Sequence, residues 1–557
     1  MLTQSPSSQG SGYQLPEYPF VSPPELRNGK KGRYPVVVVG GGLAGLAAAC
    51  DLSVRGVAVI LLDDDNTIGV RGLASRGITY AQKSLEIFER LGIYERVKAK
   101  GVEWSHGKTL ADRDVVYSFD LAASRVSKQP PFINIQQFYI EWFLVDRIVE
   151  LGRCDLRWNN KVVGVEQLSD CVRLQVETPA GNYQIEADWV LDASGVYSPI
   201  REAFKLSTHP ARGQDRWCIS DIRFKLDAPL ERWTWIEAPF NENRAVWQLP
   251  MGDGVWRLDY QMDANADPDA VSTEAVVRSR LRQQLGEDRE FELVWVGPYA
   301  YRTQMLDKMR HGRVFFLGDA AHVMSPFGGR GGNSGIQDAE NLAWKLALVL
   351  RGDAPVTLLN SYHAERHPAA VHNIKTTSRT TRFLSPESPA ERVLRNAIIS
   401  LAREHAFARP LVNTGRMSTA FTYANSPLTS HGGGAVQNVP LRLSSGKLGC
   451  LLDLFQGENC FLGLWFSVGG LTDQDVRIIT AIQRAEPLLR VVIYSPVGSG
   501  TEEFADQGGK LFTALAVEGD CFCLIRPDLH LAARLTKPTL ATICHAMRRA
   551  RGAAKEQ

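Results

Sequence analysis

The strongest constraint on the fold is a glycine-rich turn at residues 40–45 (GGGLAG), between a β-branched run at 35–39 and a helical apolar pattern at 46–54. A strand, a glycine turn and a helix in this order form a phosphate-binding unit, because the N-terminus of the helix attracts an anion. The three spaced glycines permit a tight turn, close approach of the backbone to a pyrophosphate, and close packing of helix on strand, in the order Gly40, Gly42 and Gly45. The sequence therefore predicts a dinucleotide cradle.

A second apolar run, 57–62, ends at Asp63, where a carboxylate would accept a hydrogen bond from a ribose hydroxyl. Asp63 is therefore the predicted ribose ligand. The alternative is a glycine-rich loop followed by a solvated acidic turn at 63–65, which does not explain the strand–helix–strand context. The glycine fingerprint alone does not distinguish FAD from NAD.

A second pattern of strand, glycines and helix lies far along the chain. The apolar run 313–317 leads into Gly-Asp-Ala-Ala-His at 318–322, and the glycine loop 326–333 opens a helical pattern at 336–350. Here the sequence resembles the single-component flavoprotein aromatic hydroxylases, whose second FAD motif is a strand followed by Gly-Asp-Ala-Ala-His. The resemblance extends over about 36–368.

The resemblance implies how the chain would hold FAD. Asp319 would accept a hydrogen bond from the ribityl chain, and backbone N–H groups at the helix start would stabilise negative charge on reduced flavin. Those N–H groups belong to Gly331, Gly332 and Asn333. For His322, a packed or locally hydrogen-bonded side chain is favoured over a catalytic one.

Three further positions enter through the same resemblance. Gln137, with Glu141 in the same helical motif, matches the glutamine that the family places beside the flavin. Arg76 matches the arginine placed beside FAD, with a solvated loop arginine as the alternative. Ser194 is a departure, because the family usually carries an aspartate there, before a glycine and a Ser-x-x-Arg motif.

The activity implied is that of an FAD-dependent monooxygenase, which uses NADPH or NADH and dioxygen to hydroxylate a small aromatic molecule through a flavin C4a-hydroperoxide. A phenolic substrate is favoured, and since a free phenol has a pKa of about 10, a polar group must assist its deprotonation. The candidates are Tyr260, Tyr301 and Arg257. The alternatives are an epoxidase or Baeyer–Villiger-type oxygenase acting on a polycyclic substrate, and a flavin-binding protein without turnover.

The expected fold class is α/β: a Rossmann-like FAD-binding domain with an inserted antiparallel β-sheet substrate domain and a C-terminal thioredoxin-like domain. Residues 521–528 resemble the close of that last domain in the phenol hydroxylase branch, but no Cys-x-x-Cys lies near Trp465, so a structural or dimerisation role is expected. The predicted boundaries are a disordered leader at 1–33, the FAD-binding domain at 34–215 and 303–385, the substrate domain at 216–302, a helical linker at 386–430 and the thioredoxin-like domain at 431–557.

Composition limits the partners. A chain of 557 residues exceeds the roughly 250–300 that one core supports. With 63 Lys and Arg against 61 Asp and Glu, the net charge of +2 gives no field to attract nucleic acid or a membrane surface. Nine scattered cysteines fit reduced thiols in a cytoplasmic protein, and Cys521 and Cys523 fit a buried strand better than a metal site. We therefore expect a small aromatic substrate with dioxygen and no metal, and a homodimer is left open.

Overall fold

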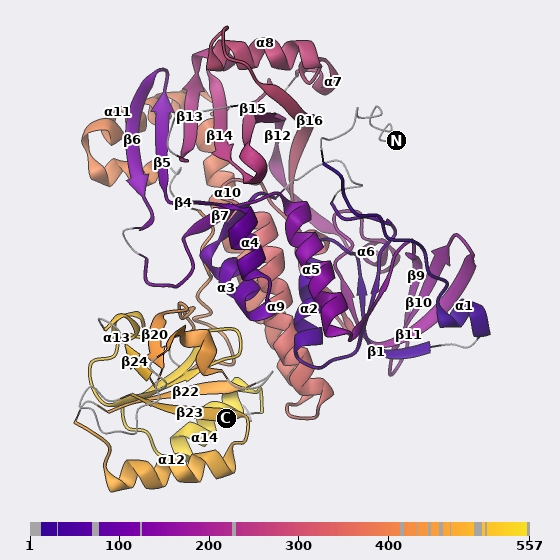
Figure 1. The fold of residues 1–557 in the computed structure, drawn as a ribbon, viewed down its shortest axis with the longest axis vertical. Helices are drawn as coiled ribbons and strands as arrows, with labels where there is room; N and C mark the ends of the chain where they lie inside the picture. Colours follow the sequence, from indigo (N-terminus) through magenta and orange to yellow (C-terminus); the bar gives the residue numbers. More distant parts are fainter. Residues whose placement is uncertain are drawn as a thin grey trace.

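The computed structural model describes residues 13–29, 32–69, 77–122, 125–224, 230–263, 265–412, 417–430, 432–443, 447–455, 460–467, 469–494, 504–506 and 509–553. These residues form a central sheet with its helices, an upper sheet, and a C-terminal unit below the central helices (Figure 1). Arg76 lies outside the described residues.

The central sheet has the strand order β17-β18-β11-β1-β2-β8, and β10 and β9 extend it from β11. Val36 to Val39 of β1 are buried, as expected for a parallel strand covered on both faces. The strand bounds are β1 (Gly32–Val39), β2 (Val59–Leu62), β8 (Cys154–Arg157), β9 (Lys161–Gln167), β10 (Val172–Thr178), β11 (Gly181–Asp192), β17 (Arg310–His311) and β18 (Val314–Phe316).

Helix α2 packs against both α9 and α5 beside this sheet (Figure 1). The helix bounds here are α2 (Leu43–Val54), α3 (Gln82–Leu91), α4 (Tyr94–Lys100), α5 (Gln137–Leu151), α6 (Pro199–Ala203), α9 (Arg330–Leu350) and α10 (Asn360–Leu384). A small sheet of order β3-β7-β4 lies next to them and consists of β3 (Thr79–Ala81), β4 (Val102–Trp104) and β7 (Phe132–Asn134). Helix α9 begins at Arg330, one turn or more before the helical pattern seen in the sequence, because Gly331 and Gly332 of the loop are themselves helical.

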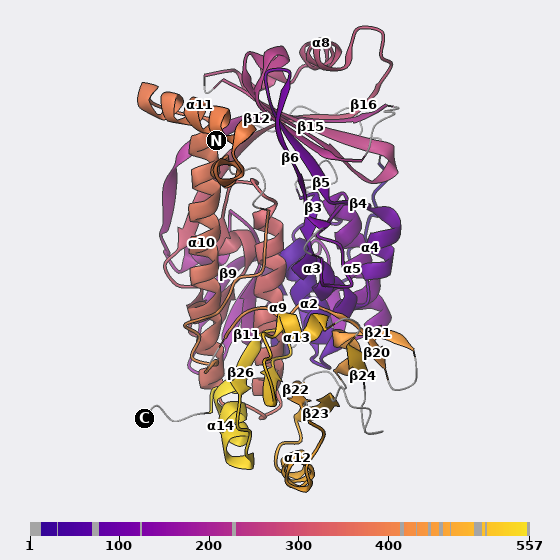
Figure 2. The ribbon, with the colours of Figure 1, turned by 90° about the vertical axis from the view of Figure 1, so that its left-hand side faces the viewer.

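The upper sheet has the order β19-β16-β12-β15-β14-β13-β5-β6. Its strands are β5 (His106–Ala111), β6 (Asp114–Asp120), β12 (Thr208–Arg223), β13 (Arg232–Ala238), β14 (Arg244–Pro250), β15 (Val255–Gln261), β16 (Glu292–Leu306) and β19 (His322–Val323). Three helices pack around it: α7 (Pro268–Val271), α8 (Glu274–Leu285) and α11 (Pro389–Glu404) (Figure 1). Figure 2 shows α8 and α11 beside the sheet from the side. The sheet is larger than the predicted insertion at 216–302, because β5 pairs in parallel with β13 and brings β6 with it.

Part of the predicted leader at 1–33 has defined structure. From Tyr13 onward it lies on the central domain and contains helix α1 (Pro24–Asn28). Glu25 forms a buried ion pair with Arg157 at 3.0 Å, and Tyr18 stacks on Trp158 with ring centroids 4.5 Å apart. Composition suggested disorder, but aromatic side chains and one buried carboxylate hold this segment in place.

The C-terminal unit contains a four-stranded sheet of order β23-β22-β25-β26 and a three-stranded sheet of order β21-β20-β24. Cys521 and Cys523 lie buried in β25, as the alternating pattern predicted. The bounds are β20 (Pro440–Leu443), β21 (Leu448–Cys450), β22 (Phe461–Phe466), α12 (Asp473–Ala485), β23 (Leu489–Tyr494), β24 (Phe504–Asp506), α13 (Lys510–Ala514), β25 (Cys521–Ile525), β26 (Leu531–Leu535) and α14 (Leu540–Ala550).

Candidate cofactor and substrate site

Two of the three fingerprint glycines are required by packing, and the third faces open space. A Cβ on Gly40, whose φ is +104°, would lie 2.5 Å from the carbonyl oxygen of Ala193. A Cβ on Gly45 would lie 1.9 Å from the carbonyl oxygen of Gly40, whereas a Cβ on Gly42 would meet nothing within 4 Å. Gly42 also precedes the first turn of α2 with no side-chain cap. The turn therefore leaves room and free N–H groups for a phosphate.

Asp63, the predicted ribose ligand, follows β2 and faces this turn. One carboxylate oxygen accepts from the backbone N–H of Gly41, and the other accepts from that of Asp65 at 2.9 Å. Burial raises the pKa of Asp63 to about 6, although these two N–H groups lower it. Asp63 is thus mostly ionised at neutral pH and holds the turn, and each oxygen keeps a lone pair for a ribose hydroxyl.

The second predicted half of the cradle meets the first at Ala44. A Cβ on Gly318 would lie 3.0 Å from the Cβ of Ala44, and a Cβ on Gly335 would lie 3.2 Å from it. The turn at Gly318, the start of α9 and the start of α2 are therefore in close contact. Asp319, next to Gly318, is exposed. The fold thus brings together two glycine motifs that are distant in sequence.

The start of α9 is fixed by Asn333. Its amide oxygen accepts from the N–H of Ala81 at 2.9 Å and from the hydroxyl of Ser84 at 2.6 Å, and its amide nitrogen donates to Thr79. The Asn333 side chain therefore anchors the helix to β3 and α3. The backbone N–H groups of the first turn, where Gly331 and Gly332 lie, have no acceptor within the helix and are available to an anion.

His322 is buried against a charged helix residue, in agreement with the packed role favoured for it. Its Nε2 lies 2.7 Å from Asp338 of α9, which also accepts from Arg366 at 2.7 Å and from the N–H of Gly318 at 3.1 Å. Burial alone would raise the pKa of Asp338, but His322 and Arg366 hold it below its usual value. Asp338, which the sequence did not single out, orients the turn that carries Asp319.

Gln137 and Glu141, one turn apart on α5, each accept a hydrogen bond from the backbone of a glycine, Gly77 and Gly69 respectively. Gln137 accepts from the N–H of Gly77 at 2.9 Å and donates to Glu141 at 2.8 Å. Glu141 accepts from the N–H of Gly69 at 2.7 Å. Burial raises the pKa of Glu141 to about 7, so this carboxyl gains or loses its proton near neutral pH.

Ser194, where the resembling family has an aspartate, lies beside another carboxylate. Asp192 accepts from the N–H of Ser194 at 3.0 Å, from its hydroxyl at 2.5 Å, and from the hydroxyl of Ser198. Burial raises the pKa of Asp192. Arg201, which follows Ser198, donates to the carbonyl of Ala320 at 3.0 Å. A carboxyl group is therefore present two residues before the expected position, at the C-terminal end of β11.

The three proposed catalytic side chains lie on two different faces of the upper sheet. The Tyr260 hydroxyl donates to Gln284 of α8 at 2.5 Å, and its ring packs under that helix. Arg257 faces the other side, where it forms a buried ion pair with Asp221 at 2.8 Å. Tyr301 also lies on that side. Because successive strand residues point to opposite faces, Tyr260 and Arg257 cannot share one cavity.

The face with Arg257 and Tyr301 looks toward the cradle and is aromatic. Phe327, in the loop before α9, packs edge-on against Trp247 with centroids 4.6 Å apart and against Trp217 at 5.8 Å. The two indoles stack on each other at 4.5 Å. These contacts connect the upper sheet to the loop before α9, which belongs to the second half of the cradle. Strand alternation in the sequence separates Arg257 from Tyr260, but it does not show which of the two faces looks toward the cradle.

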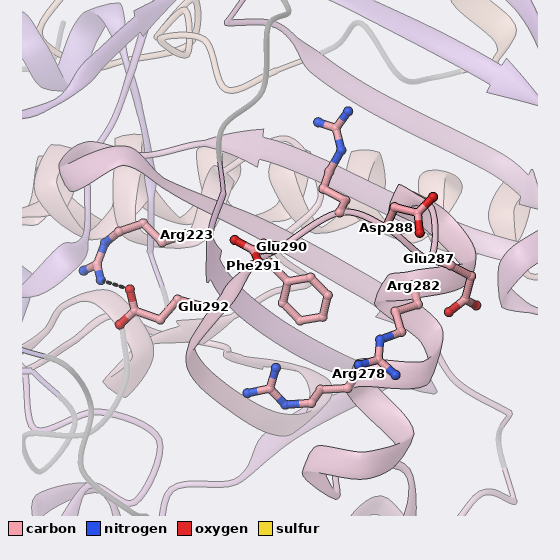
Figure 3. Close-up of a pocket in the computed structure, with 9 residues that line it drawn as sticks. Arg223, Arg278, Arg282, Glu287, Asp288, Glu290, Phe291 and Glu292 are labelled. Carbon is pink, nitrogen blue, oxygen red and sulfur yellow. Dashed lines mark hydrogen bonds and ion pairs between the residues drawn. The ribbon is translucent and has the colours of Figure 1, made fainter.

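A surface pocket on the upper sheet lies elsewhere. Figure 3 shows arginine and acidic side chains around it, with Arg223 and Glu292 paired at 2.6 Å. Its residues come from the outer end of β12, from α8 and from the segment that leads into β16. None of the predicted site residues lines it.

Replacing Asp319 with alanine should weaken FAD binding about 10- to 100-fold, because a charged acceptor contributes about 1.5–3 kcal/mol. Since Asp319 is exposed, the fold should be unaffected. The measurement is a fluorescence titration of flavin-stripped protein. Asp307→Ala is the control, because its exposed carboxylate pairs with His209 and should leave affinity unchanged. Equal FAD affinity in the Asp319 variant would show that this carboxylate does not hold the cofactor.

Among the described residues, no helix is both long and apolar enough to cross a membrane, and no group of three or more His, Cys, Asp or Glu could hold a metal ion.

Comparison with known proteins identifies the cradle. The chain is 29% identical to 6-methylpretetramide 4-monooxygenase of Streptomyces rimosus over 90% of each chain, and 30% identical to anhydrotetracycline monooxygenase of the same species over 66% of this chain and 73% of the relative. The crystal structure of the flavin-dependent monooxygenase PieE with FAD and substrate has the same fold, with a TM-score of 0.79, 22% identity, and coverage of 94% of this chain and 99% of that one. The model of the FAD binding domain family matches residues 33–377, and the chain therefore belongs to that family.

Proposed function

We propose that this protein is an FAD-dependent monooxygenase that hydroxylates an aromatic ring. The observation that carries the proposal is the contact of both cradle halves at Ala44, beneath a buried aromatic face of the upper sheet. The glycine turn and Asp63 would hold the adenosine end of FAD, and Asp319 with the start of α9 would hold the flavin end. The cradle fits this cofactor because a Cβ at Gly40 or Gly45 would close it, whereas Gly42 leaves it open.

Bound FAD supplies the activation of dioxygen, and the chain's own residues have other tasks. The N–H groups in the first turn of α9 would stabilise negative charge on reduced flavin. Trp217, Trp247 and Phe327 form a buried aromatic cluster beside the start of α9, which would exclude water from the site. The relatives named above support an aromatic substrate for this chain, and NADPH or NADH is the reductant that we propose.

We also propose that the C-terminal unit is thioredoxin-like and transfers no electrons. The strand order β23-β22-β25-β26 supports this, with β22 parallel to β23 and antiparallel to β25. The sequence contains no Cys-x-x-Cys near Trp465. Arg526 of this unit is instead fully buried against Glu365 of α10, which supports a structural role.

The test combines a spectrum with an assay. The purified protein should be yellow with about one FAD per chain, as one cradle predicts. Addition of a panel of phenols and hydroxylated polycyclic aromatics should accelerate NADPH or NADH oxidation and yield hydroxylated product. A protein that cannot be reconstituted with FAD contradicts the proposal. Bound FAD without any substrate-stimulated oxygen consumption would favour a flavin-binding protein without turnover.

A further inference from the structure

Four buried polar atoms on the cradle-facing side of the upper sheet have no hydrogen-bond partner among the described residues. They are Asp259 Oδ1, Arg232 Nε, Trp217 Nε1 and Trp247 Nε1. All four residues are more than nine-tenths buried. Buried polar atoms are almost always paired, so four orphans on one face are candidates for binding a polar partner from outside the chain.

The four residues are neighbours on the sheet. Asp259 of β15 stands directly opposite Trp247 of β14 in the strand register. The Arg232 guanidinium lies 5.8 Å from the centroid of the Trp247 ring, and the Trp217 ring stacks on the same Trp247 ring. Arg232 also donates to the sulfur of Met417, at 2.7 Å, through a nitrogen other than Nε. One carboxylate acceptor and three N–H donors therefore belong to neighbouring residues on one face of the sheet.

Asp259 differs in its hydrogen bonding from Asp221, the other carboxylate on this face. Asp221 forms two hydrogen bonds of 2.8 Å with Arg257, whereas Asp259 has no hydrogen bond or ion pair among the described residues. Burial raises the pKa of Asp259 to about 7, although Arg257 lowers it. Asp259 is therefore a carboxylate able to accept a proton near neutral pH.

We propose that Asp259 and Arg232 bind the oxygen substituents of the aromatic substrate, and that Asp259 takes the proton of its ring hydroxyl. The O–H bond of the hydroxyl breaks, its electron pair stays on the ring oxygen, and the proton bonds to Asp259 Oδ1. Arg232 and the two indoles donate to that oxygen and to a second oxygen on the ring system. The substrate class is a flat aromatic compound with a hydroxyl and a further carbonyl or hydroxyl oxygen. This inference rests on the proposed function.

The charge balance of the region favours this transfer. Arg232 lies near enough to lower the pKa of Asp259 without pairing with it, and it would stabilise the phenolate that forms. Burial lowers the pKa of Arg232 itself to about 10, so it remains charged at neutral pH. The other titratable groups facing the region are Arg257, Asp221, Tyr117 and Tyr301.

The test measures binding by FAD-loaded protein without reductant, so that it does not depend on oxygen transfer. The probes are 2-hydroxyanthraquinone and anthraquinone, which differ only in the hydroxyl. The native protein should bind the hydroxylated dye at least about 10-fold more tightly, as one charge-assisted hydrogen bond predicts. Asp259→Asn should reduce this preference to below about 3-fold, since the amide cannot take the proton.

The absorption band of the dye's phenolate gives a second readout. When the dye is bound to the native protein, its phenolate band should persist to a lower pH than in the free dye. When the dye is bound to Asp259→Asn, the band should disappear at the same pH as in the free dye. Asp263→Asn is the matched control, because Asp263 is exposed, pairs with Arg244 at 2.8 Å and follows the same strand. An unshifted band in native protein, which needs no variant to fold, overturns the inference, as does an unchanged preference in Asp259→Asn. Failure of the native protein to retain FAD would instead contradict the proposed function.

Discussion

Gly45→Ala is expected to abolish FAD retention and to destabilise the flavin-free protein. The new Cβ would lie 1.9 Å from the carbonyl oxygen of Gly40 and 3.3 Å from the Cβ of Ala193, so a small shift away from one atom brings it closer to the other. Both contacts involve the turn or the strand end that form the cradle, so helix α2 must move away from β1. Overpacking of this kind costs about 1–3 kcal/mol or more. Flavin absorbance after gel filtration and urea unfolding of stripped protein measure the two effects.

Gly42→Ala is the matched control for this experiment. Its Cβ would meet nothing within 4 Å, so stability of the stripped protein should change by no more than about 0.5 kcal/mol. FAD binding should still weaken, because the methyl group would occupy space that we assign to the pyrophosphate. A Gly45→Ala protein with native stability and native FAD content would show that the close contact at Gly40 does not shape the cradle.

Glu365→Gln is expected to lower the free energy of unfolding by about 3–5 kcal/mol, because it removes one partner from a buried ion network. Glu365 accepts from Arg526 at 2.5 Å and from Lys345 at 2.6 Å, and all three side chains have no exposed surface. The substitution leaves Lys345 without a carboxylate and Arg526 with Asp528 alone. Urea unfolding of the FAD-loaded protein measures the loss.

An exposed ion pair provides the control. Arg403 and Asp114 are 3.1 Å apart with side chains 42% and 69% exposed, so Arg403→Ala should cost no more than about 1 kcal/mol. An equally small loss of unfolding free energy for Glu365→Gln would show that this network is not a major stabilising contact between the C-terminal unit and α10.

The same network makes stability dependent on pH. Burial alone would raise the pKa of Glu365, but Arg526 and Lys345 hold it well below its usual value. A carboxyl with a depressed pKa in the folded state stabilises the protein fully above its unfolded pKa of about 4.3, and this contribution is lost progressively as the pH falls below that value. The native protein should therefore lose more stability than Glu365→Gln on acidification from neutral pH.

The cofactor cradle was predictable from sequence because its signals are local. Gly40, Gly45 and Asp63 lie within one strand–helix–strand unit, and the turn at Gly318 lies within another. Their meeting at Ala44 follows from the resemblance, not from either pattern alone. Asn333 was expected to offer a backbone N–H, but the use of its side chain as an anchor depends on β3 and α3, which only the folded structure brings near.

The upper sheet was less predictable because its pairings are not local. Nothing near β5 indicates that it pairs with β13, more than a hundred residues away. The sequence favoured Tyr260 for its aromatic hydroxyl, whereas the adjacent Asp259, on the opposite face of β15, has a carboxylate oxygen without a hydrogen-bond partner among the described residues. Which face looks toward the cradle depends on Phe327, which comes from a distant loop.

The most direct measurement of the central claim is the origin of the product oxygen. The FAD-loaded protein, supplied with NADPH or NADH and a hydroxylated aromatic that stimulates its oxygen uptake, is allowed to react under ¹⁸O₂ in ordinary water. Mass spectrometry of the product should show one ¹⁸O atom bonded to the ring. A product that carries only oxygen from water, or oxygen uptake that yields hydrogen peroxide without a modified aromatic, would contradict the account.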